Sequence, residues 1–163
     1  MRHVAPPIAL AGLSFVVLLG VAGGLMVHFS DTLRTNRSEV VRAMGAMSAT
    51  QRVLDDMQDA ETGQRGYLIT QRESYLAPFN GAAAAAIRHI GDARALMADS
   101  PSQQARLTTL ETLVQRKFAE MTAGLESLRA SGFEAARNLV LTDIGKAVMD
   151  EIRETVQAVL AEE

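Results

Sequence analysis

Apolar residues recur along most of this chain at steps of three, four or seven positions, and no segment shows the strict alternation of a half-buried strand. Between residues 30 and 69 the expected inward stripe is Leu33, Val40, Met44, Met47 and Leu54. No proline or turn motif interrupts this segment. We therefore predict one long helix over residues 30–69 that extends directly from the apolar segment before it.

That apolar segment, IALAGLSFVVLLGVAGGLMV at residues 8–27, contains no charged residue. A helix of about 20 apolar residues is long enough to cross a bilayer. We predict a retained membrane anchor, and the alternative is a cleaved signal peptide with AGG at residues 22–24 as a weak cleavage site. Arginines lie on both sides of the segment, so the positive-inside rule does not orient it.

Three more helices are predicted. The second covers about residues 74–99 and starts after Thr70-Gln71-Arg72-Glu73, which has the form of a capping box. Its expected stripe is Leu76, Phe79, Ala83, Ala86, Ile90, and Leu96 or Met97. The third begins at Ser100-Pro101-Ser102-Gln103 and ends at Gly132 in a left-handed conformation, with Leu107, Leu110, Val114, Phe118, Met121, Leu125 and Leu128 inward.

The fourth helix has a weak centre. Its expected inward residues are Phe133, Ala136, Val140, Ile144, Val148, Ile152 and Val159, and the sequence Thr142-Asp143-Ile144-Gly145 predicts a kink or short break. Tight turns make neighbouring helices antiparallel. The predicted fold class is all-α, an up-down-up-down four-helix bundle on an N-terminal transmembrane helix. Residues 1–29 form the N-terminus and anchor, and residues 30–163 form the bundle.

Composition excludes several chemistries. The chain has no cysteine, so disulfides, thiolate metal sites and covalent haem are impossible. It has no Glu-x-x-His pair for a di-iron bundle and no glycine-rich phosphate loop. The net charge of −3 argues against nucleic acid as a partner. We predict no catalytic residue, no cofactor and no metal site in this chain.

The three histidines do not change this picture. His3 and His28 flank the apolar segment, where an interfacial position explains them. We interpret His89 as a solvated surface residue. The alternative, a phosphotransfer histidine, lacks the acidic neighbour of kinase dimerisation helices and the lysine-glycine that follows it in phosphotransfer bundles.

A polar patch stands where the first helix should show an apolar face, within DAETGQRGYLITQRESYL at residues 59–76. A constant rise per residue places Glu61 level with Lys117 and Lys146. Our hypothesis pairs Glu61 with either lysine, and Arg65 with Glu61 or Asp143. An exposed i,i+4 pair of Glu61 with Arg65 and a direct ligand contact remain alternatives.

Two glycines in the patch are expected to let the first helix approach the alanine run at residues 82–86. The whole predicted signature and polar network is Asp59, Glu61, Thr62, Gly63, Gln64, Arg65, Gly66, Tyr67, Lys117, Asp143 and Lys146.

The patch sequence resembles the signature of the third type of CHASE domain, the cyclase- and histidine-kinase-associated sensory extracellular domain. The resemblance rests on DAETGQRGYL at residues 59–68 and ESYL at 73–76. It continues through QQARL at 103–107, KFAE at 117–120 and GKAVMDEIR at 145–153. Family members commonly carry glycine and an acidic residue where this chain has Gln71-Arg72, so this turn departs from the pattern.

The resemblance implies an extracytoplasmic sensory domain, with the amino terminus in the cytoplasm and the bundle in the periplasm of an inner-membrane protein. Such domains usually lie between two membrane helices ahead of a kinase, cyclase or chemoreceptor module. This sequence has neither a second membrane helix nor an output module before Glu163. We expect a signal-input domain of a receptor that acts as a homodimer and responds to an unknown extracellular stimulus or small ligand. The alternative is a stand-alone, membrane-anchored interaction protein of the cell envelope.

Overall fold

The computed structural model describes the backbone of residues 5–162 and the side chains of residues 18–26 and 37–162. Every element within residues 5–162 is helical, which confirms the all-α class. The chain divides into two compact units, Met1–Val41 and Arg42–Glu163. The expected positions of Leu33 and of His3 and His28 lie outside the described side chains.

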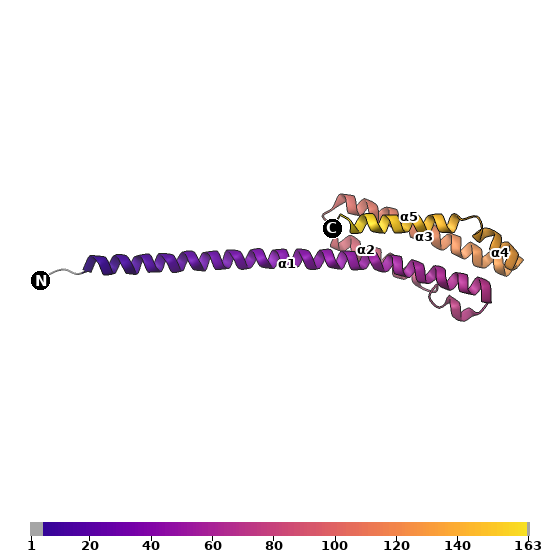
Figure 1. The fold of residues 1–163 in the computed structure, drawn as a ribbon, viewed down its shortest axis with the longest axis horizontal. Helices are drawn as coiled ribbons and strands as arrows, with labels where there is room; N and C mark the ends of the chain where they lie inside the picture. Colours follow the sequence, from indigo (N-terminus) through magenta and orange to yellow (C-terminus); the bar gives the residue numbers. More distant parts are fainter. Residues whose placement is uncertain (1–4, 163) are drawn as a thin grey trace. The chain divides into compact units, whose positions relative to one another are not determined.

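The helices follow one another with short connections (Figure 1). The first, α1, spans Ala5–Thr70 and contributes residues to both units. A short 3₁₀ helix, η1 (Glu73–Leu76), leads to α2 (Ala82–Leu96) and α3 (Pro101–Ser131). Two further helices, α4 (Phe133–Val140) and α5 (Ile144–Leu160), complete the second unit.

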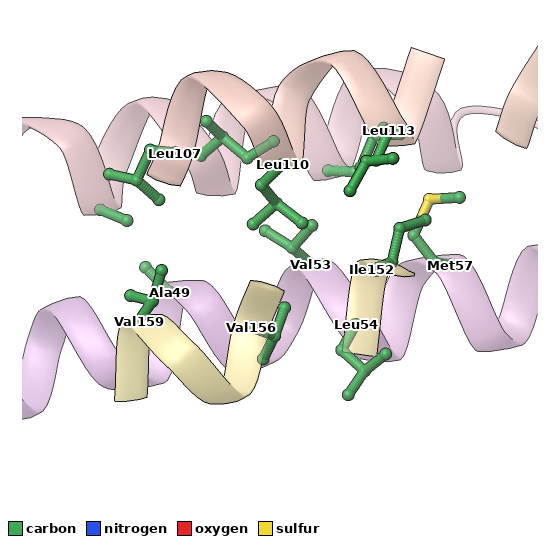
Figure 2. Packing of buried hydrophobic residues seen from close by; sticks show 14 of the residues in the cluster. Ala49, Val53, Leu54, Met57, Leu107, Leu110, Leu113, Ile152, Val156 and Val159 are labelled. Carbon is green, nitrogen blue, oxygen red and sulfur yellow. The ribbon is translucent and has the colours of Figure 1, made fainter. Parts of the chain in front are cut away.

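The core of the second unit lies between α1, α2, α3 and α5. Figure 2 shows Val53, Leu110 and Val156 among the side chains that fill the space between three of these helices. A smaller apolar cluster, centred on Tyr67, Leu76 and Leu125, lies where α1, η1 and α3 meet α4. Burial of these side chains supplies the main favourable contribution to folding.

The inward face of α1 differs from the predicted one. Ala46, Ala49, Val53, Met57 and Ala60 are buried, together with the predicted Leu54. The predicted Val40, Met44 and Met47 are exposed instead. The helix carries two apolar stripes, and periodicity alone cannot tell which one faces the core. The alanine-rich stripe is the one that packs against the neighbouring helices.

The connection from α1 to α2 is longer than predicted, and the capping box does not form. Helix α2 begins at Ala82 rather than near residue 74, because Pro78 lacks an N–H and Gly81 has a φ of +88°. The Thr70 hydroxyl accepts a 3.3 Å hydrogen bond from the Arg72 backbone N–H, and no side chain caps η1. Glu73 instead accepts a 3.2 Å hydrogen bond from the Tyr67 hydroxyl.

Gly63 and Gly66 do allow a close approach to α1, but the segment that approaches is not the predicted one. A Cβ on Gly63 would lie 2.5 Å from the Tyr75 carbonyl oxygen, and one on Gly66 would clash with the Tyr75 ring. The two glycines leave room for the connection that contains η1, and the alanine run at residues 82–86 does not approach them. The reason is that residues 73–81 fold back onto α1 instead of continuing a helix.

The boundaries of α3 follow the prediction. The Ser100 hydroxyl accepts a 3.4 Å hydrogen bond from the Gln103 N–H, and Pro101 occupies the first turn. Gly132 ends the helix with a φ of +82°, in the region that favours glycine. Its ψ of −177° is extended, so the conformation is not the left-handed helical one that was expected.

The predicted break in the fourth helix is confirmed, since α4 ends at Val140 and α5 starts at Ile144. Asp143 adopts a φ of +58° at this point. The break shifts the inward face, because the helical phase is not carried across residues 141–143. Ala136, Val148, Ile152 and Val159 are buried as predicted, whereas Phe133, Val140 and Ile144 are exposed.

The predicted anchor at residues 8–27 falls largely on side chains outside the described residues. Across the described part of the chain, no helix has a stretch long and apolar enough to span a bilayer.

The contact at Gly63 predicts opposite outcomes for two glycine substitutions. Gly63→Ala should lower the free energy of unfolding by about 1–3 kcal/mol, because its methyl group displaces the Tyr75 backbone. Gly91→Ala, in α2 with open space around it, should raise that free energy by about 0.5–1 kcal/mol. Urea denaturation of both variants measures the difference. Equal stabilisation by both would show that η1 does not approach α1 this closely.

Candidate functional site

A buried lysine forms the centre of the polar site. Lys117, on α3, has only 2% of its surface exposed. Its ammonium nitrogen lies 2.9 Å from Glu61 Oε1, 2.8 Å from Glu120 Oε2 and 3.0 Å from the Gly145 carbonyl oxygen. An ammonium group has three N–H donors, so these three partners satisfy it completely. The lysine thereby joins α1, α3 and the first turn of α5.

Glu61 links this lysine to the surface. Its side chain is 12% exposed, and Oε1 also lies 3.1 Å from Arg65 Nη2. Arg65 itself is 54% exposed. One of the two proposed pairings of Glu61, that with Lys117, is therefore present, and so is the pair with Arg65. The alternative, an exposed pair of Glu61 with Arg65 alone, is wrong because Glu61 is largely buried and also contacts Lys117.

Two more signature residues are buried on the same stretch of α1. Gln64 is 3% exposed, and its amide donates a 3.4 Å hydrogen bond to the Met121 carbonyl oxygen of α3. Gly124 gives this amide room, since a Cβ there would lie 2.9 Å from Gln64 Nε2. Tyr67 packs in the smaller core, and its hydroxyl donates a hydrogen bond to Glu73.

Asp143 and Lys146 take other roles than those predicted. Both line a cavity of about 90 Å³ next to Lys117, but no ion pair is present between Arg65 and Asp143 or between Glu61 and Lys146. Lys146 instead lies 2.6 Å from Asp150, one turn along α5. This hydrogen bond raises the pKa of Lys146 and lowers the pKa of Asp150.

The remaining predicted residues do not join the network. Asp59 and Thr62 are exposed on α1. Glu120 and the Gly145 carbonyl do join it, although sequence reasoning did not place them there. Glu120 lies three residues after Lys117, a spacing that puts both on one helix face, so its position carried a usable signal. The backbone carbonyl carried none.

The expectation for His89 was wrong. Its Nδ1 lies 2.8 Å from Asp56 Oδ2 of α1, and its side chain is mostly buried rather than solvated. The carboxylate comes from another helix, 33 positions away in sequence, which explains why local sequence did not reveal it.

The arrangement pairs its charged groups with one another. Among the residues with described side chains, no buried side-chain polar atom lacks a partner, and no group of three or more possible metal ligands occurs. Four residues of alternating charge are connected in the order Arg65, Glu61, Lys117, Glu120. Such a cluster can join helices, and it can rearrange as a unit when one of them shifts.

Residues 36–163 match the family model described as the CHASE3 domain. The chain belongs to the CHASE3 domain family. No curated protein matches the sequence. Among solved structures, the sensor domain of the histidine kinase HK9 from Rhodopseudomonas palustris is similar to this chain, with a TM-score of 0.66 and 23% sequence identity. The match covers 72% of this chain and 91% of that one, and at this identity it shows a common fold.

Family membership assigns the general function of this CHASE3 domain. CHASE3 domains are sensory, extracellular parts of receptors, so the chain contains a signal-input domain. The family is not itself catalytic, and no catalytic domain is evident in the described residues. The resemblance seen in the sequence is thereby confirmed.

The contact of Glu61 with buried Lys117 predicts that the domain is sensitive to the loss of this carboxylate. Glu61→Ala should lower the free energy of unfolding by about 3–5 kcal/mol, because Lys117 stays buried with one carboxylate fewer. Glu134→Ala is the matched control, since its side chain is 75% exposed and its pair with Arg137 should contribute at most about 1 kcal/mol. Thermal and urea unfolding measure both. A Glu61 variant as stable as the control would contradict a structural role for the network.

Proposed function

We propose that this CHASE3 domain is the periplasmic input of an inner-membrane receptor. In this proposal the helices form an up-down-up-down four-helix bundle after residue 29, and residues 8–27 anchor it as a transmembrane helix. The uncharged sequence of residues 8–27 supports the anchor. The four helices that share one core, α1, α2, α3 and α5, support the bundle.

The observation that carries a relay role is the triple contact of Lys117. A single ammonium group contacts Glu61 of α1, Glu120 of α3 and the Gly145 carbonyl at the start of α5. Packed helices change between discrete arrangements more readily than they deform. A stimulus that moves α5 or the α4–α5 break would therefore move α1 through this lysine. Because α1 also contains residues 8–27, its movement is the output that we propose.

The nature of the output module is proposed from the family. A kinase, a diguanylate cyclase or a chemoreceptor module would read a shift of the membrane helix. The stimulus acts from outside the cell on the unit that begins at Arg42. No nucleic acid and no cofactor has a role in this mechanism.

The absence of cysteine allows a direct test of topology. A Ser74→Cys variant of the full chain carries one thiol at an exposed position in η1. A membrane-impermeant maleimide should label it in intact cells whose outer membrane has been permeabilised. Arg2→Cys should be labelled only after lysis, because the amino terminus is proposed to be cytoplasmic. Protection of Ser74→Cys before lysis would place the domain on the wrong side for this proposal.

We also propose that the receptor acts as a parallel homodimer that uses exposed apolar residues of α1. Met44 is 65% exposed and Met47 is also exposed, although both are large apolar residues. Apolar side chains that remain in water on one helix face are typical of an interaction surface. In a parallel dimer whose twofold axis runs beside α1, residues of α1 on the contact face lie near their own copies across the axis.

This geometry predicts a specific cross-link. Met44→Cys in the full chain should form a disulfide-linked dimer under mild oxidation, because the two copies of the residue meet across the axis. Gln115→Cys, at an exposed position of α3, should remain monomeric on a non-reducing gel. Equal cross-linking of both variants would indicate random collisions rather than the proposed dimer.

A further inference from the structure

An apolar cavity of about 260 Å³ lies beside the polar network, in the second unit. Its walls come from the last turns of α1, with Arg65, Leu68 and Ile69, and from α4, with Phe133, Arg137 and Val140. Three of the apolar residues, Ile69, Phe133 and Val140, are exposed. Large apolar side chains gathered around a hollow are typical of a binding site for an apolar group.

The size of the cavity limits its occupant. Small-molecule pockets typically have volumes of about 300–1,000 Å³. This cavity falls just below that range. It therefore fits a small organic molecule rather than a peptide or the two acyl chains of a lipid. Its walls are wholly apolar, so the part of the ligand inside must be apolar too.

The charged residues around the cavity select the sign of the ligand. The only charged residues that line it are Arg65 and Arg137, which contribute their aliphatic stems and keep their guanidinium groups in water. Each guanidinium has one carboxylate partner, Glu61 or Glu134, and five N–H donors. Both retain donors for another carboxylate. Glu134 is so exposed that water screens its pair with Arg137, and that pair is easily displaced.

The position of Arg65 connects the cavity to the relay. Arg65 and Val140 line both this apolar cavity and the polar cavity beside Lys117. A ligand carboxylate on Arg65 would share its guanidinium group with Glu61, whose Oε1 also contacts Lys117. A ligand held here would therefore alter the charge balance at the lysine that joins α1, α3 and α5.

We propose that this cavity binds a small organic monocarboxylate, with its apolar body among Leu68, Ile69 and Phe133 and its carboxylate on Arg65 and Arg137. The proposal rests on the proposed sensory role of the domain and names the chemical class of its stimulus.

Isothermal titration calorimetry on the full chain, reconstituted in phospholipid nanodiscs, tests the proposal. The probes are hexanoate, cyclohexanecarboxylate and phenylacetate, which present a linear, a cyclic and an aromatic body. Each is compared with the alcohol of similar shape (hexanol, cyclohexylmethanol and phenylethanol), with acetate as the acid that lacks an apolar body. Empty nanodiscs supply the blank. At least one acid should saturate the protein, and its alcohol and acetate should bind at least about tenfold more weakly.

Matched arginine variants locate the site. Arg137→Gln should weaken the best acid by about tenfold or more, because a charge-assisted hydrogen bond is lost. Arg129→Gln removes an exposed arginine of α3 that does not line the cavity, and it should bind the acid as the unmodified chain does. Arg65→Gln should also weaken binding. Thermal unfolding of the ligand-free variants checks that each remains folded, and Arg137→Gln decides the result if Arg65→Gln does not.

Three results would overturn the proposal: no acid saturates the protein, an alcohol binds as tightly as its acid, or Arg137→Gln binds as tightly as Arg129→Gln. None of these results would change the outcome expected for maleimide labelling of Ser74→Cys or for the cross-linking of Met44→Cys. If those two tests succeed while the acids fail, the receptor role stands and only the ligand class is wrong.

Discussion

The contact of one buried ammonium group with three elements determines how the second unit is held together. Lys117 lies in the interior, and Glu61, Glu120 and the Gly145 carbonyl occupy all three of its donors. Removing any partner would leave part of a buried charge without compensation. The positions of α1, α3 and α5 are therefore linked at this point by a polar requirement in addition to their apolar packing.

The neighbourhood of this lysine combines features that permit movement. The helix is interrupted between α4 and α5 at Asp143, a non-glycine residue with a positive φ. A small polar cavity borders Lys117, and Gly145 leaves room for the Glu120 carboxylate, which a Cβ there would approach to 2.6 Å. The apolar cavity of α1 and α4 lies alongside. These features lie together at the point where α1, α3 and α5 are joined.

The family assignment and the physical description support each other. The residues that carry the CHASE3 resemblance include Glu61, Gln64, Tyr67 and Lys117, and each is buried or largely buried with a defined partner. The signature is thus explained as a structural requirement for joining α1 to α3 and to η1. The two glycines of the signature have the same origin, since Tyr75 of η1 occupies the space that their side chains would fill.

Sequence by itself determined the all-helical class, the start of α3 at its serine cap, the break in the fourth helix and the family, because each depends on local or ordered chemistry along the chain. It also suggested Lys117 as a partner of Glu61, because a constant rise per residue fixes the level of each residue on its helix. Only the tertiary structure decided which stripe of α1 faces the core, that η1 folds back on Gly63, and that Asp56 contacts His89. These depend on helix rotation and on contacts between distant segments, and both apolar stripes of α1 satisfy the same periodicity. The Gly145 carbonyl belongs to that group as well, since every residue has a backbone carbonyl and only folding selects one as a ligand for an ammonium group.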